Sequence, residues 1–458
     1  MANLGRLFRG LMDAASEAAP AADNVANNLR ISTRLPTATK AVENPLTNML
    51  SIGAHEAIQG NTGAFNANLL PTYPGYARLA GLPPEEIAQG YIDQSTDNLR
   101  FLIENLPTGV LDETAQWYEG ANRISNAFAD QYGLPVQSTS AALAALSPQK
   151  DWYQNASLGE RLIDIYSRMN DGSRNMSSEV SPEMLSFMRN SGAYKDPAVD
   201  VMIGKPFAEM TPLEQAMFIR AYDEVNNPRV YRQVTPEGMY ADVVTSASGA
   251  PSRVAWGSFN EISKAIQALQ SGGDMDVISP LLGERHKVRN FYNNIVDPTE
   301  QFGRYGDVTA DTHAVAANQL RPLSGNTVAV AHNFKNALAN QYRPDDWVGA
   351  KGSSLTGVQG TYGFNVDPYR NIAEEYGIAP RAAQSVAWEA GRALFPAEFK
   401  TAANANMIDN IWRAYDAGEI DVNQARQAVF EAAGGFGEGN WGQPRSGLLA
   451  PETGSTYR

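Results

Sequence analysis

The sequence has no cysteine and only four histidines among its 458 residues. The lack of cysteine excludes disulfides, thiolate metal sites and cysteine nucleophiles. The histidines are too scattered to form the ligand spacing of a zinc site. We therefore expect a protein that works without a metal ion or another cofactor.

Charged side chains are also scarce, at 19% of the residues, and the formal net charge is -14. Neutralising phosphates needs Lys and Arg, so an acidic chain is not a general nucleic-acid binder, and any contact with DNA must come from a local basic surface. Apolar residues reach 43%, which suffices for a sizeable core. The length allows two or three domains.

Long apolar runs are missing too. Because no run reaches the length of a transmembrane helix and charges interrupt the apolar residues at the N-terminus, we expect neither a membrane span nor a signal peptide. Five apolar residues near that end share one face of a helix, namely Leu4, Leu7, Phe8, Leu11 and Met12. This stripe predicts a helix docked on its own domain or on a partner, or alternatively an anchor for a membrane, a virion or a partner groove.

Helical periodicity dominates the pattern that is present, and the predicted class is mainly α. Strand signals are confined to about residues 230–244. We expect helices from 117 to about 133, from 138 or 139 to 146, from 147 onward, over 211–224, 258–271 and 284–296, from 311 onward, over 380–394, and as a pair within 405–432.

Composition divides the chain into four parts. Residues 1–45 join the amphipathic stretch to an Ala-, Asn- and Thr-rich extension, and the prolines of residues 46–111 predict irregular structure with short helices. Residues 112–395 form the main helical domain, with a loop-rich insertion at about 170–250. Residues 396–458 hold the terminal helices and a Gly-rich tail that we expect to be flexible.

Two of the three segments suited to chemistry have the form of helix starts. Ser147-Pro148 predicts a helix that would hold Gln149 in its first turn, where a long amide can reach outward. Asp311, in the run Asp311-Thr312-His313, is suited to cap a helix. Each has an ordinary structural interpretation when it is taken alone.

The remaining segment is the densest cationic cluster of the chain. It places Arg285, His286, Lys287 and Arg289 within five positions, followed directly by aromatic and Asn side chains. Such a cluster can hold a phosphate or stack on a base. The alternative is a solvated helix face.

In this order, the three segments resemble the helix-hairpin-helix superfamily of DNA glycosylases, of the endonuclease III and adenine-glycosylase kind. Leu146, Ser147 and Gln149 match its Leu-Ser-x-Gln segment, whose Gln approaches the gap left by a flipped base. Asp311-Thr312-His313 matches its Val-Asp-Thr-His-type segment, whose Asp is the catalytic carboxylate. Together with the phage resemblance described below, the similarity covers roughly residues 112–395.

The resemblance implies a helix-hairpin-helix fold with a loop-rich insertion and a base-flipping reaction on DNA, with Asp311 as the catalytic residue. Gln149 would probe the vacated stack. The DNA contacts that we predict are Arg285, Lys287, Arg289, His313, Trp152, Asn155, Tyr292, Asn294, Trp388 and Arg392. The three aromatic residues among them could instead belong to the core.

The hairpin departs from the family pattern. Of the Leu-Pro-Gly-x-Gly signature only Leu282-Gly283 is present. Members that act as lyases carry a lysine two residues after the last glycine, where this chain has Arg285, and Lys287 comes four residues after it. The spacing therefore predicts against Schiff-base lyase activity. The iron–sulfur cluster of the family is excluded by the lack of cysteine.

A second resemblance is to a set of uncharacterised bacteriophage proteins, on residues 117–118, 146–155, 287–295 and 384–392. This resemblance implies that the protein is to be expected in the host cytoplasm or in the virion of a phage. Three functions stay open: a DNA N-glycosylase, a transferase of phage DNA base hypermodification, and a non-catalytic virion-associated or structural protein. The last would contact other virion proteins through the N-terminal helix.

Overall fold

The computed structural model describes residues 73–437, except 149, 151, 171–178, 195–198, 227–231, 246–249, 252–255, 284–285, 299–305, 326 and 335–361. The fold is mainly helical, as the sequence predicts, and its sheet is one two-stranded hairpin. None of the helices in the described residues combines the length and the apolar character needed to span a membrane. The N-terminal stripe of residues 4–12 and most of the Gly-rich tail lie outside the described residues.

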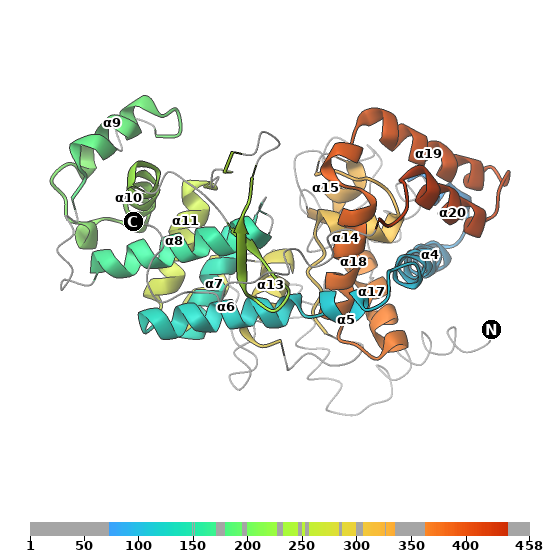
Figure 1. Ribbon diagram of the computed structural model, residues 1–458, viewed down its shortest axis with the longest axis horizontal. Coiled ribbons are helices and arrows are strands. Elements are labelled where there is room, and N and C mark those ends of the chain that lie inside the picture. The colour runs from blue at the N-terminus through green and yellow to red at the C-terminus, as the bar shows by residue number, and fades with distance from the viewer. Residues whose placement is uncertain are drawn as a thin grey trace.

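Figure 1 shows two groups of helices side by side, which we call the first lobe and the second lobe. The first lobe contains α6 (Trp117–Tyr132), α7 (Val136–Leu146), α8 (Trp152–Asn170), α9 (Pro182–Asn190), α10 (Pro212–Asn226), α11 (Phe259–Gln270), α12 (Met275–Leu282) and α13 (His286–Val296), with strands β1 (Arg232–Val234) and β2 (Tyr240–Val243). The second lobe contains α4 (Pro84–Glu104), α5 (Val110–Thr114), α14 (Thr312–Gln319), α15 (Val328–Phe334), α17 (Tyr362–Tyr376), α18 (Pro380–Leu394), α19 (Ala402–Asp416) and α20 (Val422–Ala432). Short 3-10 turns lie at Ala77–Leu79, Asp200–Met202, Phe207–Glu209 and Ala397–Phe399.

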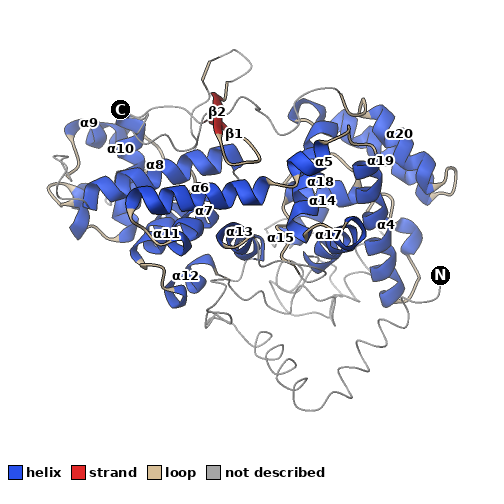
Figure 2. Ribbon diagram, turned by 60° about the horizontal axis from the view of Figure 1, so that its bottom comes forward, coloured by secondary structure: helices blue, strands red, loops and turns tan. Residues whose placement is uncertain are grey.

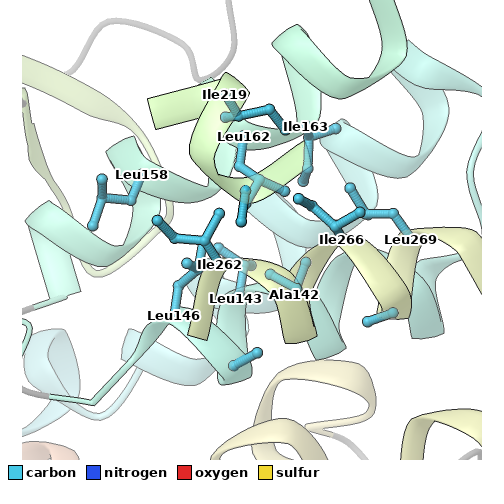
Figure 3. Packing of buried hydrophobic residues seen from close by; sticks show 14 of the residues in the cluster. Ala142, Leu143, Leu146, Leu158, Leu162, Ile163, Ile219, Ile262, Ile266 and Leu269 are labelled. Atoms are coloured by element: carbon cyan, nitrogen blue, oxygen red, sulfur yellow. The ribbon is translucent and has the colours of Figure 1, made fainter. Parts of the chain in front are cut away.

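The core of the first lobe is built around α7, which contacts α6, α8, α11, α12 and α13. Every residue of this helix from Ser138 to Leu146 is buried, as expected for a helix that is enclosed on all sides. Figure 3 shows Leu143 pointing into a cluster with side chains of α8 and α11, among them Leu162 and Ile266. Four alanines in α7 leave room for its neighbours to approach closely.

The second lobe packs α4 against α14, α17 and α18. Its core also takes in buried side chains of the last two helices, such as Trp412 of α19 and Val429 of α20. The two lobes meet where α18 contacts α6, and Figure 2 shows α13 next to this boundary. A buried side of α4 and two C-terminal helices therefore belong to the same core as α14.

The predicted insertion is integrated into the first lobe. Arg161 of α8 and Asp223 of α10 form a buried ion pair of 2.8 Å, and the Trp256 indole N–H donates to the same carboxylate at 2.9 Å. Phe207 and Phe218 are fully buried in the core beside it. A buried pair is strongly disfavoured if either partner is lost, so residues 200–226 are part of the lobe rather than an appended loop.

Several predicted elements match the structure. Helices α6, α10, α11, α13, α14, α18 and the pair α19 and α20 lie where periodicity and capping place them, and the hairpin lies within 230–244. Gly133 ends α6 in the left-handed conformation (φ 64°) that glycine adopts readily. Asp311 caps α14 as expected.

Three predictions were wrong. Residues 84–104, expected to be irregular, form the 21-residue helix α4, because Pro84 stands at its first turn, where a missing N–H costs nothing. Helix α7 begins at Val136 after Pro135, so Ser138 is buried inside it rather than capping it. Ser147 is the C-cap of α7, and Pro148 lies in the turn before α8 rather than at a helix start.

The hairpin is seated on α6 through two glycines. A Cβ built on Gly120 would lie 2.1 Å from the Pro236 carbonyl oxygen and 2.5 Å from the Gly238 nitrogen. Both atoms belong to the backbone of the turn between β1 and β2, which cannot yield as a flexible side chain does. The close approach therefore requires glycine at position 120.

We expect Gly120→Ala to lower the free energy of unfolding by about 1–3 kcal/mol, the usual cost of overpacking a site that cannot relax. Urea unfolding followed by circular dichroism would measure the change. Gly192→Ala is the matched control, because a Cβ there would meet nothing within 4 Å. Equal stability of the two variants would contradict this account of the hairpin contact.

Candidate active site

The turn between α12 and α13 is tied by an arginine. Gly283 takes a positive φ of 67° there, and its N–H donates to the Ser279 carbonyl at 3.1 Å. The buried Arg289 guanidinium reaches back and donates to the Ser279 hydroxyl and to the Gly283 carbonyl, both at 3.1 Å. Arg289 thus fixes the angle between the two helices. It is not available to DNA, which corrects its predicted role as a contact.

Two asparagines of α13 hold the extended segment that leads to α14. The Asn293 amide donates to the Asp307 carboxylate at 2.7 Å, and the Asn294 amide donates to the Thr309 hydroxyl at 3.1 Å. All four residues are buried. Asn294 therefore holds the segment before α14 in place, and its predicted role in binding DNA is wrong.

Tyr362 of α17 fixes the same segment from the other lobe. Its hydroxyl donates to the Val308 carbonyl at 2.9 Å and accepts the Ala310 N–H at 3.0 Å. Residue 311 follows directly. Helix α13 and helix α17 thus set the position of Asp311 together.

Asp311 stands at the N-terminus of α14 and is half-buried. One carboxylate oxygen accepts the Ala314 N–H at 2.9 Å, which makes it the N-cap. Within the described part of the chain, no other hydrogen bond or ion pair is made by this side chain. The second oxygen is therefore available to a ligand.

Lys287, in the first turn of α13, brings the other two segments together. Its ammonium group donates to the Ser147 hydroxyl at 2.9 Å and to the Ser147 carbonyl at 3.3 Å, and it lies 5.2 Å from the centre of the Phe291 ring. Burial lowers the pKa of Lys287 to about 8, and the nearby Asp311 carboxylate opposes this shift. We call Asp311, Lys287 and Ser147 the Asp311 centre.

A second group of side chains lies next to Asp311 on the α14–α18 side. The His313 ring is 6.3 Å from the Trp388 ring, edge to face, and the Arg392 guanidinium stacks over the same indole at 4.4 Å. Burial lowers the pKa of His313 to about 4, against the pull of Asp311, while Lys400 and Arg392 lower it further. His313 is therefore neutral at physiological pH.

Aromatic side chains pack against one another near the contact of α6 with α18. Trp152 and Tyr118 each pack edge to face on Phe291, with centroids 5.9 and 6.2 Å apart. The Tyr118 hydroxyl donates to the Gln384 side chain at 2.8 Å. Burial raises the pKa of Tyr118 well above its usual value, and the negative charge of Asp311 contributes to this rise.

The structure gathers some of the predicted residues and separates others. Asp311, Lys287, His313, Trp388 and Arg392 lie together, and Trp152 reaches the group through Phe291. Asn155 and Tyr292 are instead buried within the first lobe. The Asn155 amide donates to the Leu143 carbonyl at 2.9 Å, and the Tyr292 hydroxyl lies 3.2 Å from the Met275 sulfur.

Their predicted DNA contacts are wrong, because the folding of α8 and α13 turns these side chains into the core. Gln149 and Arg285 lie outside the described residues. Sequence reasoning missed Lys400, whose ammonium group is near enough to Asp311 and Arg392 to interact electrostatically with both. It lies beyond the stretch that carries the resemblance, and no motif surrounds it. Reasoning from the sequence also missed that Ser147 accepts from Lys287.

A family model described as a family of unknown function (DUF7178) matches residues 98–181. The matched stretch runs from α4 into the residues after α8 and includes Ser147, but neither Lys287 nor Asp311. No curated protein and no solved structure matches the chain. The function is therefore argued from the site itself.

Substitutions at Asp311 can separate its capping role from its charge. Asn caps a helix about as well as Asp, whereas Ala does not, so we expect Asp311→Asn to change the free energy of unfolding by less than about 0.5 kcal/mol and Asp311→Ala to lower it by about 1 kcal/mol. Asp421→Ala, which removes the cap of α20, is the matched control. Urea titration would measure all three, and an Asn variant as unstable as the Ala variant would show that the second oxygen has a structural partner.

Proposed function

We propose that this protein is a base-flipping, glycosylase-like enzyme that acts at a modified base of DNA. The observation that carries the proposal is the convergence of three segments, far apart in sequence, on one carboxylate. Ser147 holds the amine of Lys287, and Lys287 lies within electrostatic reach of Asp311. These are the segments on which the resemblance to helix-hairpin-helix glycosylases rests.

The chemistry of the Asp311 centre suits cleavage of an N-glycosidic bond. Breaking this bond builds positive charge on the sugar as the base leaves with the bonding electrons. The Asp311 oxygen that has no partner among the described residues would stabilise that charge, and a fixed group in a partly enclosed site does so more strongly than water. The base must leave the stack to reach the centre, and Trp152 and Trp388 are half-buried aromatic surfaces on which it could lie.

Lys287 adds a nucleophile to this centre, in contrast to the expectation from hairpin spacing. With a pKa of about 8, roughly a tenth of its amine is uncharged at pH 7. The neutral amine would attack C1′ and form a nitrogen–carbon bond, while the base departs with the bonding electrons and takes up a proton. Opening of the C1′–O4′ bond of the sugar would then give the imine that borohydride reduces. The same centre would serve a transferase of base hypermodification if a small nucleophile reacted at the flipped base, with the glycosidic bond left intact.

Asp311→Asn should abolish excision while leaving the fold and DNA binding intact. We expect the rate to fall by about a hundredfold to a thousandfold, because the charge that stabilises the transition state is removed. Incubation with duplexes carrying modified bases, followed by alkaline strand scission, would measure the rate. Asp421→Asn is the control, since it changes a capping carboxylate far from the site. An unchanged rate in Asp311→Asn would refute the proposed role.

Lys287 should be trapped on DNA by borohydride. The trapping rate depends on the uncharged amine, so below the pKa of about 8 it should fall about tenfold for each pH unit, and above pH 8 it should level off. Lys287→Arg, which keeps the charge but cannot form the adduct, should yield none. Mass spectrometry of the trapped peptide identifies the lysine. A flat pH profile or an adduct at another lysine would contradict this assignment.

Two observations favour a second function. The N-cap bond to Ala314 by itself explains an aspartate at position 311, and the net charge of -14 does not favour DNA. A non-catalytic protein of a phage virion, which keeps a glycosylase-like helical scaffold, would retain both features. It would excise no base, and Asp311→Asn would leave its association with other virion proteins unchanged.

A further inference from the structure

Lys400 and Arg392, which we call the cation pair, come from two elements at the end of the second lobe. Arg392 lies in the last turn of α18, and Lys400 follows the 3-10 turn at Ala397–Phe399. Both side chains are half-buried. Each cation acts electrostatically on His313, and Lys400 also interacts with Asp311.

The backbone around Lys400 is held in place on both sides. Phe399 packs on the buried Phe395 ring at 5.7 Å, and its carbonyl accepts the Asn404 amide at 2.9 Å. Thr401 caps α19 by accepting the Asn404 N–H at 3.2 Å. The backbone of Lys400 is thus fixed between a packed ring and a helix cap, so the fold sets the point from which its side chain extends.

The cations of this group are not neutralised equally. Lys400 makes no hydrogen bond or ion pair within the described part of the chain, although Asp311 attracts it. Arg392 is stacked on Trp388. Two like charges repel each other across a partly buried site, and burial costs Lys400 solvation as well. Asp311 and the buried Glu389, which interacts electrostatically with Arg392, offset part of this repulsion. An anion that enters between the two cations would offset more of it.

We propose that Lys400 and Arg392 form a phosphate subsite that holds a phosphodiester next to the nucleotide whose sugar reaches Asp311. This inference rests on the proposed function and names how the strand is gripped. Phosphate is the anion that a flipped nucleotide necessarily brings to within a few ångströms of its C1′. The neutral His313 and the stacked Trp388 would border the sugar beside it.

Under the proposed function, the subsite would also supply positive charge that an acidic chain needs to bind DNA. The cationic cluster at the start of α13 offers less positive charge to DNA than its sequence suggests, because Arg289 is buried in the α12–α13 turn. Lys400 and Arg392 supply positive charge from the opposite lobe. The strand would then be held across the boundary of the lobes, with Lys287 on one side and the cation pair on the other.

The test measures DNA binding, not turnover, as a function of salt. The full chain is titrated into a fluorescent duplex that carries a non-cleavable abasic analogue, and the affinity is read from fluorescence anisotropy at several salt concentrations. Each phosphate contact contributes about 0.9 to the slope of log affinity against log salt. We expect Lys400→Gln to lower the slope by about 0.9 and the Lys400→Gln/Arg392→Gln variant by about 1.8.

Lys400→Arg keeps the charge and should keep the slope. Arg189→Gln is the matched control, because it removes an exposed cation from α9 in the first lobe. Thermal melting of each variant checks that the fold is retained. If Lys400→Gln and Arg189→Gln bind alike, the subsite is refuted, whereas loss of excision in Asp311→Asn would still support the proposed function.

Two further outcomes would also overturn the inference. Inorganic phosphate, added at constant ionic strength, should not compete with the duplex more strongly in the wild type than in Lys400→Gln. Stronger competition would show that the cation pair binds free phosphate rather than the strand. If the wild type binds no duplex and excises no base, the proposed function and the subsite both fall.

Discussion

A buried segment that belongs to no helix or strand, residues 306–310, determines where Asp311 stands. In a sheet, neighbouring strands would satisfy its polar groups, but the strands in the described residues belong to the distant β1–β2 hairpin. Buried backbone groups still need hydrogen-bond partners. The side chains of Asn333, Tyr362 and Arg370 bond the backbone of this segment. Asn293 and Asn294 hold it by bonding the side chains of Asp307 and Thr309.

These side chains come from both lobes, so the segment couples the lobes to each other. The asparagines of α13 approach it from one side, and Tyr362 approaches it from α17. There is also little space around it, since a Cβ on Gly306 would lie 2.9 Å from the Pro380 ring. Lys287 is carried by the same α13 helix. The geometry between the amine and the Asp311 carboxylate is therefore fixed by buried hydrogen bonds rather than by a direct ion pair.

Burial and the Asp311 charge have opposite effects on the titratable groups around Asp311. Burial disfavours the charged forms of Lys287, Lys400 and His313, whereas Asp311 favours them. Burial prevails at all three groups, and it leaves the Lys287 amine partly neutral and the His313 imidazole neutral. The N-terminus of α14 favours a negative charge at Asp311. A chain with a net charge of -14 thus concentrates cations around one carboxylate.

Some residues of the candidate site could be predicted from the sequence and others could not. Asp311 was identified because a short run with a helix-start pattern carries local information. Four of the predicted DNA contacts are of residue types that often bind DNA, yet each is buried. They are Asn155, Asn294, Tyr292 and Arg289. Whether an amide or guanidinium faces solvent or a buried carbonyl depends on the packing of helices that are distant in sequence.

By itself, the sequence determined the helical class, most helix positions and the cap at Asp311, because periodicity, caps and terminal glycines are local signals. Only the tertiary structure decided that Ser147, Lys287 and Asp311 come together. It also decided that Arg289 is enclosed in the α12–α13 turn and that Lys400 joins the group from the C-terminal part of the chain. Those contacts link residues as far apart as 147 and 287. The packing of the two lobes brings such residues together, and no pattern within one segment records it.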